Sequence, residues 1–164
     1  MFANTLKTIS DLIVKSNGTP IQYGKEKYGF KRRYYVSEQE IFTFENTYNI
    51  KIPKAYKEFL LTVGSCSLFI MEKTGNGYDF LAPNEVHDWS NIVFTGTDCN
   101  LFPEILLTVS IPALGHQAGF LTTKDSDNFG EFYPDIPPEY WIEDTDFYNF
   151  EEWLEGLLQE RLSF

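Results

Sequence analysis

The chain has 164 residues, of which 43% are hydrophobic, so it is long and apolar enough to fold as a single domain around its own core. It has no apolar run of about eighteen residues, which excludes a membrane-spanning helix. The formal net charge is −11: residues 1–60 carry ten Lys and Arg against six Asp and Glu, whereas residues 61–164 carry three against eighteen. Such an acidic second half repels nucleic acid and anionic membranes, so we expect neither as a partner.

The first predicted element is an amphipathic helix over about residues 3–15, with one apolar stripe formed by Leu6, Ile9, Leu12 and Ile13. The pair Asn17-Gly18 ends it, because both residues tolerate the left-handed backbone. Residues 21–36 are basic and aromatic without a clean period, which indicates an irregular or strand-like arm. We expect its cations to pair with the acidic half of the protein or to form part of a binding face.

Two further helices follow the arm. Ser37 and Glu40 form a capping-box pattern at the start of the first, and its predicted buried residues are Ile41, Phe44 and Tyr48. The second helix begins near Pro53, a residue tolerated at the first helical position. Its apolar stripe consists of Tyr56, Phe59, Leu60 and Val63, and Gly64 provides its C-terminal cap.

After Gly64 the hydrophobic period shortens to that of strands. Strands are predicted at 67–72, 78–81, 104–111, 118–123 and 130–134, with a short helix over 82–94 between the second and third. A closing helix over 149–162 has Asn149 as its N-cap. Helices first, then antiparallel strands, then a last helix predict an α+β fold with a mostly antiparallel sheet.

No catalytic or metal site can be assembled from the sequence pattern. Cys66, His87, Cys99 and His116 lack the close pairs of a zinc site, and the loop 125–131 lacks two ligands of a calcium-binding loop. Two cysteines are too few for a disulfide framework, and the N-terminus lacks the features of a signal peptide. We therefore expect reduced thiols, no cofactor, no metal and a cytoplasmic protein.

The order of these elements resembles the SUKH superfamily, which includes the yeast cell-wall regulator Smi/Knr and many bacterial immunity proteins. The segment "IPKAYKEFLLTVG" carries the family pattern at Ile52, Pro53, Tyr56, Phe59, Leu60 and Gly64. Downstream, "YDFLAPNEVHDW", "AGFLTT", "GEFYP" and "NFEEWLEGLL" are similar to later family elements. The resemblance covers about residues 37–160, so we expect one domain over 1–164, with residues 1–36 as an N-terminal helix and basic arm.

The resemblance implies an α+β fold and protein binding without catalysis. Bacterial members typically neutralise a cognate toxin, often a nuclease, and a nuclease that grips phosphates is basic at its active site. The resemblance therefore implies an immunity protein whose acidic surface binds a basic toxin. The alternative is an intracellular scaffold or regulatory adaptor, the role of the eukaryotic relatives. An enzyme with a composite site around His87 and Cys99 ranks last.

The candidate binding surface is the acidic and aromatic segment "EFYPDIPPEYWIEDTDFYNFEEW". Its expected anchors are Tyr140 and Trp141, surrounded by Asp135, Glu139, Glu143, Asp144 and Asp146. By family resemblance, Asp79, Glu85, Asp88 and Trp89 extend the same face. The alternative for Trp141 is that it closes the core over the last helix.

Overall fold

The computed structural model describes residues 2–96, 101–112, 114–124, 126–134 and 149–162. Its helices are α1 (Phe2–Ser16), α2 (Glu38–Tyr48), α3 (Lys54–Thr62), α4 (Pro83–Thr95) and α5 (Phe150–Leu162). Its strands are β1 (Ile21–Tyr23), β2 (Glu26–Tyr34), β3 (Ser65–Met71), β4 (Tyr78–Phe80), β5 (Ile105–Ile111), β6 (His116–Leu121) and β7 (Phe132–Tyr133). None of the helices in this part of the chain is long and apolar enough to cross a membrane.

The strands form one sheet in the order β1-β2-β3-β4-β5-β6-β7, and every neighbouring pair is antiparallel. Each strand therefore lies beside the next one along the chain, even where α2 and α3, or α4, intervene. The predicted α+β class with a mostly antiparallel sheet is confirmed, and so are the N-terminal helices and the closing helix.

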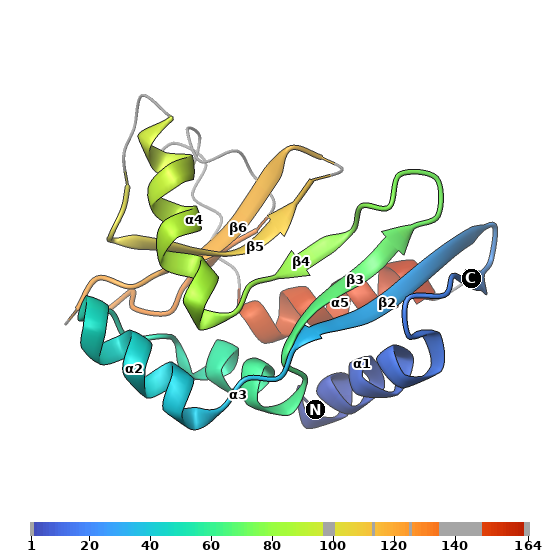
Figure 1. The fold of residues 1–164 in the computed structure, drawn as a ribbon, viewed down its shortest axis with the longest axis horizontal. Helices are drawn as coiled ribbons and strands as arrows, with labels where there is room; N and C mark the ends of the chain where they lie inside the picture. Colours follow the sequence, from blue (N-terminus) through green and yellow to red (C-terminus); the bar gives the residue numbers. More distant parts are fainter. Residues whose placement is uncertain (1, 97–100, 113, 125, 135–148, 163–164) are drawn as a thin grey trace.

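The helices cover the two faces of the sheet unequally. Figure 1 shows α1, α3 and α5 on one side, whereas α4 stands on the other. Strand β5 contributes side chains to the hydrophobic clusters on both faces of the sheet. Leu106 and Val109 belong to the large core cluster, whereas Ile105 and Leu107 pack in a second cluster with Phe94 of α4. This alternation follows from the two-residue period of a strand that is buried on both faces.

Helix α3 packs as its apolar stripe predicts. Tyr56, Phe59 and Leu60 are at most 1% exposed, and Pro53 is the N-cap, one residue before the position expected from the sequence. Gly64 ends the helix with a positive φ of 93° and leads directly into β3. A Cβ on Gly64 would lie 2.5 Å from the carbonyl oxygen of Tyr34, so only glycine allows β2 to approach this closely.

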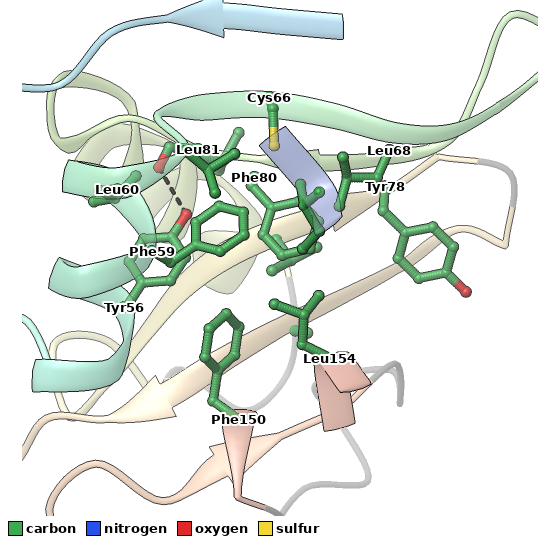
Figure 2. Packing of buried hydrophobic residues seen from close by; sticks show 14 of the residues in the cluster. Tyr56, Phe59, Leu60, Cys66, Leu68, Tyr78, Phe80, Leu81, Phe150 and Leu154 are labelled. Carbon is green, nitrogen blue, oxygen red and sulfur yellow. Dashed lines mark hydrogen bonds between the residues drawn. The ribbon is translucent and has the colours of Figure 1, made fainter. Parts of the chain in front are cut away.

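An aromatic cluster fills the centre of the large core, where α3, β4 and α5 converge (Figure 2). The ring of Phe150 lies 5.7 Å from that of Tyr56, 6.0 Å from that of Phe59 and 5.3 Å from that of Phe120, measured between centroids. The hydroxyl of Tyr56 is buried with these rings and donates to the carbonyl oxygens of Leu81 and Thr108, at 2.8 and 3.1 Å. Burial raises the pKa of Tyr56 well above its usual value, so the group remains a neutral donor.

The basic arm is a β-hairpin that belongs to the sheet. Strand β1 pairs with β2, and β2 pairs with β3, while Tyr28 and Phe30 enter the large core cluster. The strand-like alternative is therefore correct for this segment. Its period is obscured by register shifts between Gly29 and Lys31 and between Arg32 and Tyr34, because each shift changes the face on which the following side chains lie.

One predicted core residue of α2 is not buried. Ile41 and Phe44 are 4% exposed, as expected, and Ser37 accepts the backbone N–H of Glu40 as the predicted N-cap. Tyr48, however, is 40% exposed, so its assignment to the core was wrong. It lies in the last turn of α2, beyond the part of the helix that the core covers, and it stacks instead on His87 of α4.

We expect Tyr56→Phe to lower the free energy of unfolding by about 1–2 kcal/mol, because the carbonyl oxygens of Leu81 and Thr108 lose the hydroxyl donor and that of Thr108 keeps only the N–H of Leu81. Tyr56→Ala should cost about 3–5 kcal/mol through the cavity it leaves. Urea unfolding measures both, with Tyr34→Phe as the control at a residue that is 51% exposed. If Tyr56→Phe is as stable as the wild type, the hydroxyl does not hold these strands.

Candidate functional site

The predicted binding residues fall into two groups. Seven of them lie outside the described residues: Asp135, Glu139, Tyr140, Trp141, Glu143, Asp144 and Asp146. The other four lie on β4 and α4, namely Asp79, Glu85, Asp88 and Trp89. Of the predicted binding surface, the structure therefore describes only the part formed by β4 and α4.

Glu85 holds the first turn of α4 in place. Its carboxylate accepts two hydrogen bonds from the guanidinium of Arg33, at 2.9 and 2.6 Å, and a third from the backbone N–H of Ala82, at 2.9 Å. Arg33 also donates to the hydroxyl of Ser65 at 3.1 Å. Both charged side chains are 26% exposed. This bidentate pair joins β2 of the basic arm to the start of α4.

The electrostatics of Arg33 reflect this pairing. Partial burial by itself lowers the pKa of the guanidinium, but the hydrogen bond and the negative charge of Glu85 raise it, with a further contribution from Asp79. The net effect is a raised pKa, so Arg33 stays charged. One cation, Arg33, thus interacts electrostatically with both Glu85 and Asp79. It neutralises part of the negative charge that the sequence places on this face.

Asp79 lies on the same face of the sheet as a row of polar residues. Its carboxylate accepts a hydrogen bond of 2.6 Å from the hydroxyl of Ser67 on β3. The row crosses five strands through paired positions: Lys31, Ser67, Asp79, Ser110 and Gln117. Lys31 is exposed and the others are half-buried. Asp79 is therefore held inside a polar strip and is less available to a partner than the sequence suggests.

Asp88 and Trp89 are adjacent in sequence but face different surroundings. Trp89 packs against both hydrophobic clusters and is partly buried, so its ring contributes mainly to the attachment of α4 to the sheet. The side chain of Asp88 is 80% exposed and lies 3.3 Å from Nδ1 of His87. Of the four described residues, Asp88 is exposed and the other three are half-buried.

His87 connects α4 to α2. Its ring stacks on that of Tyr48 with a centroid distance of 3.7 Å and an interplanar angle of 13°. On the other side it meets the ring of Phe102 edge-on, at 5.0 Å. Tyr48, the α2 member of this stack, also lines a groove between the two helices, which we call the α2–α4 groove.

The α2–α4 groove has a volume of about 370 Å³. It is lined by Gln39, Glu40, Thr43, Phe44, Thr47, Tyr48, Pro83 and Asn84. Helices α2 and α4 contain five Asp and Glu residues and no Lys or Arg. Glu45 is paired with Lys57 at 2.8 Å and Glu85 with Arg33. In the part of the chain that the structure describes, Glu38, Glu40 and Asp88 have no Lys or Arg partner.

Sequence reasoning missed α2 as part of this surface. Phe42 is 62% exposed, and it lies off the stripe formed by Ile41 and Phe44. An aromatic residue that lies off the buried stripe of an amphipathic helix is expected to be exposed. The sequence alone could therefore have indicated the exposure of Phe42. The position of Tyr48 beside His87 was not, because 39 residues separate them.

Cys66 and the metal-ligating residue types were the sequence candidates for a catalytic or metal centre. Cys66 is buried, and burial raises the pKa of its thiol far above the usual range, so it is not a nucleophile. Within the described ranges, no group of three or more His, Cys, Asp and Glu residues could hold a metal ion. Cys99 and Asp125, which the sequence raised as candidates, lie outside those ranges.

We expect Arg33→Ala and Glu85→Ala to be coupled by about 1–2 kcal/mol of unfolding free energy, because the pair is bidentate and partly buried. Urea unfolding of the wild type, both single variants and the double variant gives this value. The exposed pair of Lys7 and Asp11 is the control, with an expected coupling below about 0.5 kcal/mol. A coupling no larger than the control value would show that the pair does not anchor α4.

Two comparisons with known proteins bear on the function of this surface. The model of the SMI1/KNR4 family (SUKH-1) matches residues 35–156. The chain is also 40% identical over 157 residues to immunity protein RhsIB of Dickeya dadantii (strain 3937), a match that covers 95% of this chain and 94% of that protein. The prediction of a non-enzymatic protein is confirmed by this homology, because the relative is an immunity protein and the family is non-enzymatic. The chain belongs to the SMI1/KNR4 (SUKH-1) family and is a homologue of an immunity protein.

Proposed function

We propose that this protein binds a cognate bacterial toxin and neutralises it in the cytoplasm of the cell that makes the immunity protein. The observation that carries the proposal is the 40% identity to immunity protein RhsIB across almost the whole of both chains. A match of that extent must include most of the basic arm and at least part of α1, which precede the residues matched by the family model.

We further propose that the toxin is basic, with a nuclease as the expected class. The support is the charge distribution: residues 61–164 carry eighteen Asp and Glu against three Lys and Arg. A nuclease must attract phosphates and is therefore positively charged where its substrate binds. An acidic protein can occupy that region in place of the nucleic acid and associate quickly through electrostatic steering.

Neutralisation in this proposal requires binding alone. Carboxylates on the immunity protein set the rate of association and exclude non-cognate partners, and a few aromatic side chains supply most of the affinity. The proposed contact residues remain those of the acidic segment, with Tyr140 and Trp141 as anchors and Asp135, Glu139, Glu143, Asp144 and Asp146 around them. Asp88 extends this surface from α4, where it is exposed.

Co-expression with the toxin encoded by the adjacent gene tests the proposed function. Cells that produce the toxin alone should stop growing, and cells that also produce this protein should grow as fast as cells without the toxin. A non-cognate member of the same family is the control and should not protect. Growth arrest despite soluble expression of both proteins would refute the proposal.

Charge reversal tests the acidic segment separately. We expect Asp144→Lys together with Asp146→Lys to slow association with the toxin, and more strongly at low salt, because screening weakens steering between exposed charges. Stopped-flow mixing measures the association rate constant at several salt concentrations. The neutral pair Asp144→Asn and Asp146→Asn should show a smaller effect in the same direction. An unchanged rate constant would remove this segment from the interface.

A further inference from the structure

The α2–α4 groove has the form of a binding site for one side chain and its flanking residues. Its volume of about 370 Å³ lies near the lower end of the range for ligand sites. Phe44, Tyr48 and Pro83 supply apolar surface, and Thr43 and Thr47 lie along the same side of α2. Groups of this kind accept an aliphatic or aromatic side chain.

The walls of the groove are held in place from several directions. At the N-terminus of α2, Ser37 accepts the backbone N–H of Glu40. At the other end of α2, the ring of Tyr48 is stacked on His87. The first turn of α4 is fixed by the carboxylate of Glu85, which binds both Arg33 and the N–H of Ala82. A groove with fixed walls loses little conformational entropy when a partner enters it.

The negative charge around the groove determines which kind of segment it favours. Glu40 lines the groove, Glu38 lies at the start of the same helix, and Asp88 lies one turn beyond Asn84 on α4. Lys124 approaches this region at the C-terminal end of α2, where it contacts Asn49. The three carboxylates are exposed and are not paired with Lys or Arg among the described residues. They favour a segment that carries Lys or Arg.

One exposed ring lines the same groove. Tyr48 is 40% exposed and lines it, whereas Phe42, which is 62% exposed, belongs to the same helix but is not a lining residue. Aromatic residues exposed beside a groove are typical binding anchors, since they bury a large area with few rotatable bonds. A symmetric dimer formed groove to groove would bring carboxylates against carboxylates, so the groove does not suit that form of self-association.

From these observations we propose that the α2–α4 groove binds a basic segment of the toxin, with an apolar side chain in the groove and Lys or Arg residues beside Glu40 and Asp88. The inference rests on the proposed function and names a contact site that the acidic segment does not include. It assigns α2, which contains none of the residues expected from the sequence, to the interface.

Two independent changes test the groove. Thr43→Trp fills it from an exposed position on α2, and Glu40→Lys with Asp88→Lys reverses the charge at its rim. The matched control for the charge change is Glu152→Lys with Glu160→Lys on α5, which lies on the side of the sheet opposite α4 (Figure 1). Glu152 lies in the first turn of α5, as Glu40 does in α2, so these two substitutions lose a similar helix-dipole interaction.

The dissociation constant is measured by calorimetry with the product of the adjacent toxin gene, inactivated by substitution in its own active site. Each groove variant should bind at least about tenfold more weakly than the wild type, and the α5 control should stay within about threefold. Thermal melts establish that each variant is folded. Wild-type affinity in both folded groove variants would overturn the inference while leaving the proposed function intact. Failure of the wild type itself to bind would refute the proposed function.

Discussion

The hydroxyl of Tyr56 holds the junction between the end of strand β4 and the start of helix α4. It donates to the carbonyl oxygens of Leu81 and Thr108, and the backbone N–H of Leu81 donates to the same Thr108 oxygen at 2.9 Å. The register of β5 shifts between Leu107 and Val109, so the chain can offer this carbonyl to both donors. The next residue, Ala82, is the N-cap of α4. A side chain of the family motif in α3 therefore determines where the candidate binding helix begins.

The basic arm, most of which precedes the residues matched by the family model, also holds this junction. Arg33 lies on β2, two residues before the first matched position, and its guanidinium holds Glu85 in the first turn of α4. Tyr56 thus fixes the junction from the core side, and Arg33 fixes it from the edge of the sheet. In the proposed interface, α4 is attached at both sides and can present Asp88 and the α2–α4 groove in one orientation, which favours slow dissociation of a bound partner.

Sequence reasoning succeeded where a local pattern decides the structure. The spacing of Tyr56, Phe59 and Leu60 predicts the buried face of α3, and Gly64 predicts its end, because both depend on the backbone within one or two turns. The stack of Tyr48 on His87 and the pair of Arg33 with Glu85 join residues far apart in the chain, the latter by 52 positions. Neither contact has a local signature. Glu85 was accordingly predicted as a partner-binding acid, whereas its carboxylate is engaged within the fold.

The acidic residues of α2 and α4 are of two kinds: some are paired within the fold, and others are exposed and unpaired with Lys or Arg among the described residues. Only the second kind adds to the negative field that a partner meets. Glu45 and Glu85 are paired with Lys57 and Arg33, so they stabilise the fold and contribute little net field outside it. Glu38, Glu40 and Asp88 are exposed, and their field reaches an approaching protein over about a Debye length. The cations of the N-terminal half therefore serve, in part, to cancel structural acids. What remains near α2 and α4 is a smaller negative charge, placed beside the exposed ring of Tyr48, and in the proposed complex the position of that charge matters more for recognition than the total of −11 does.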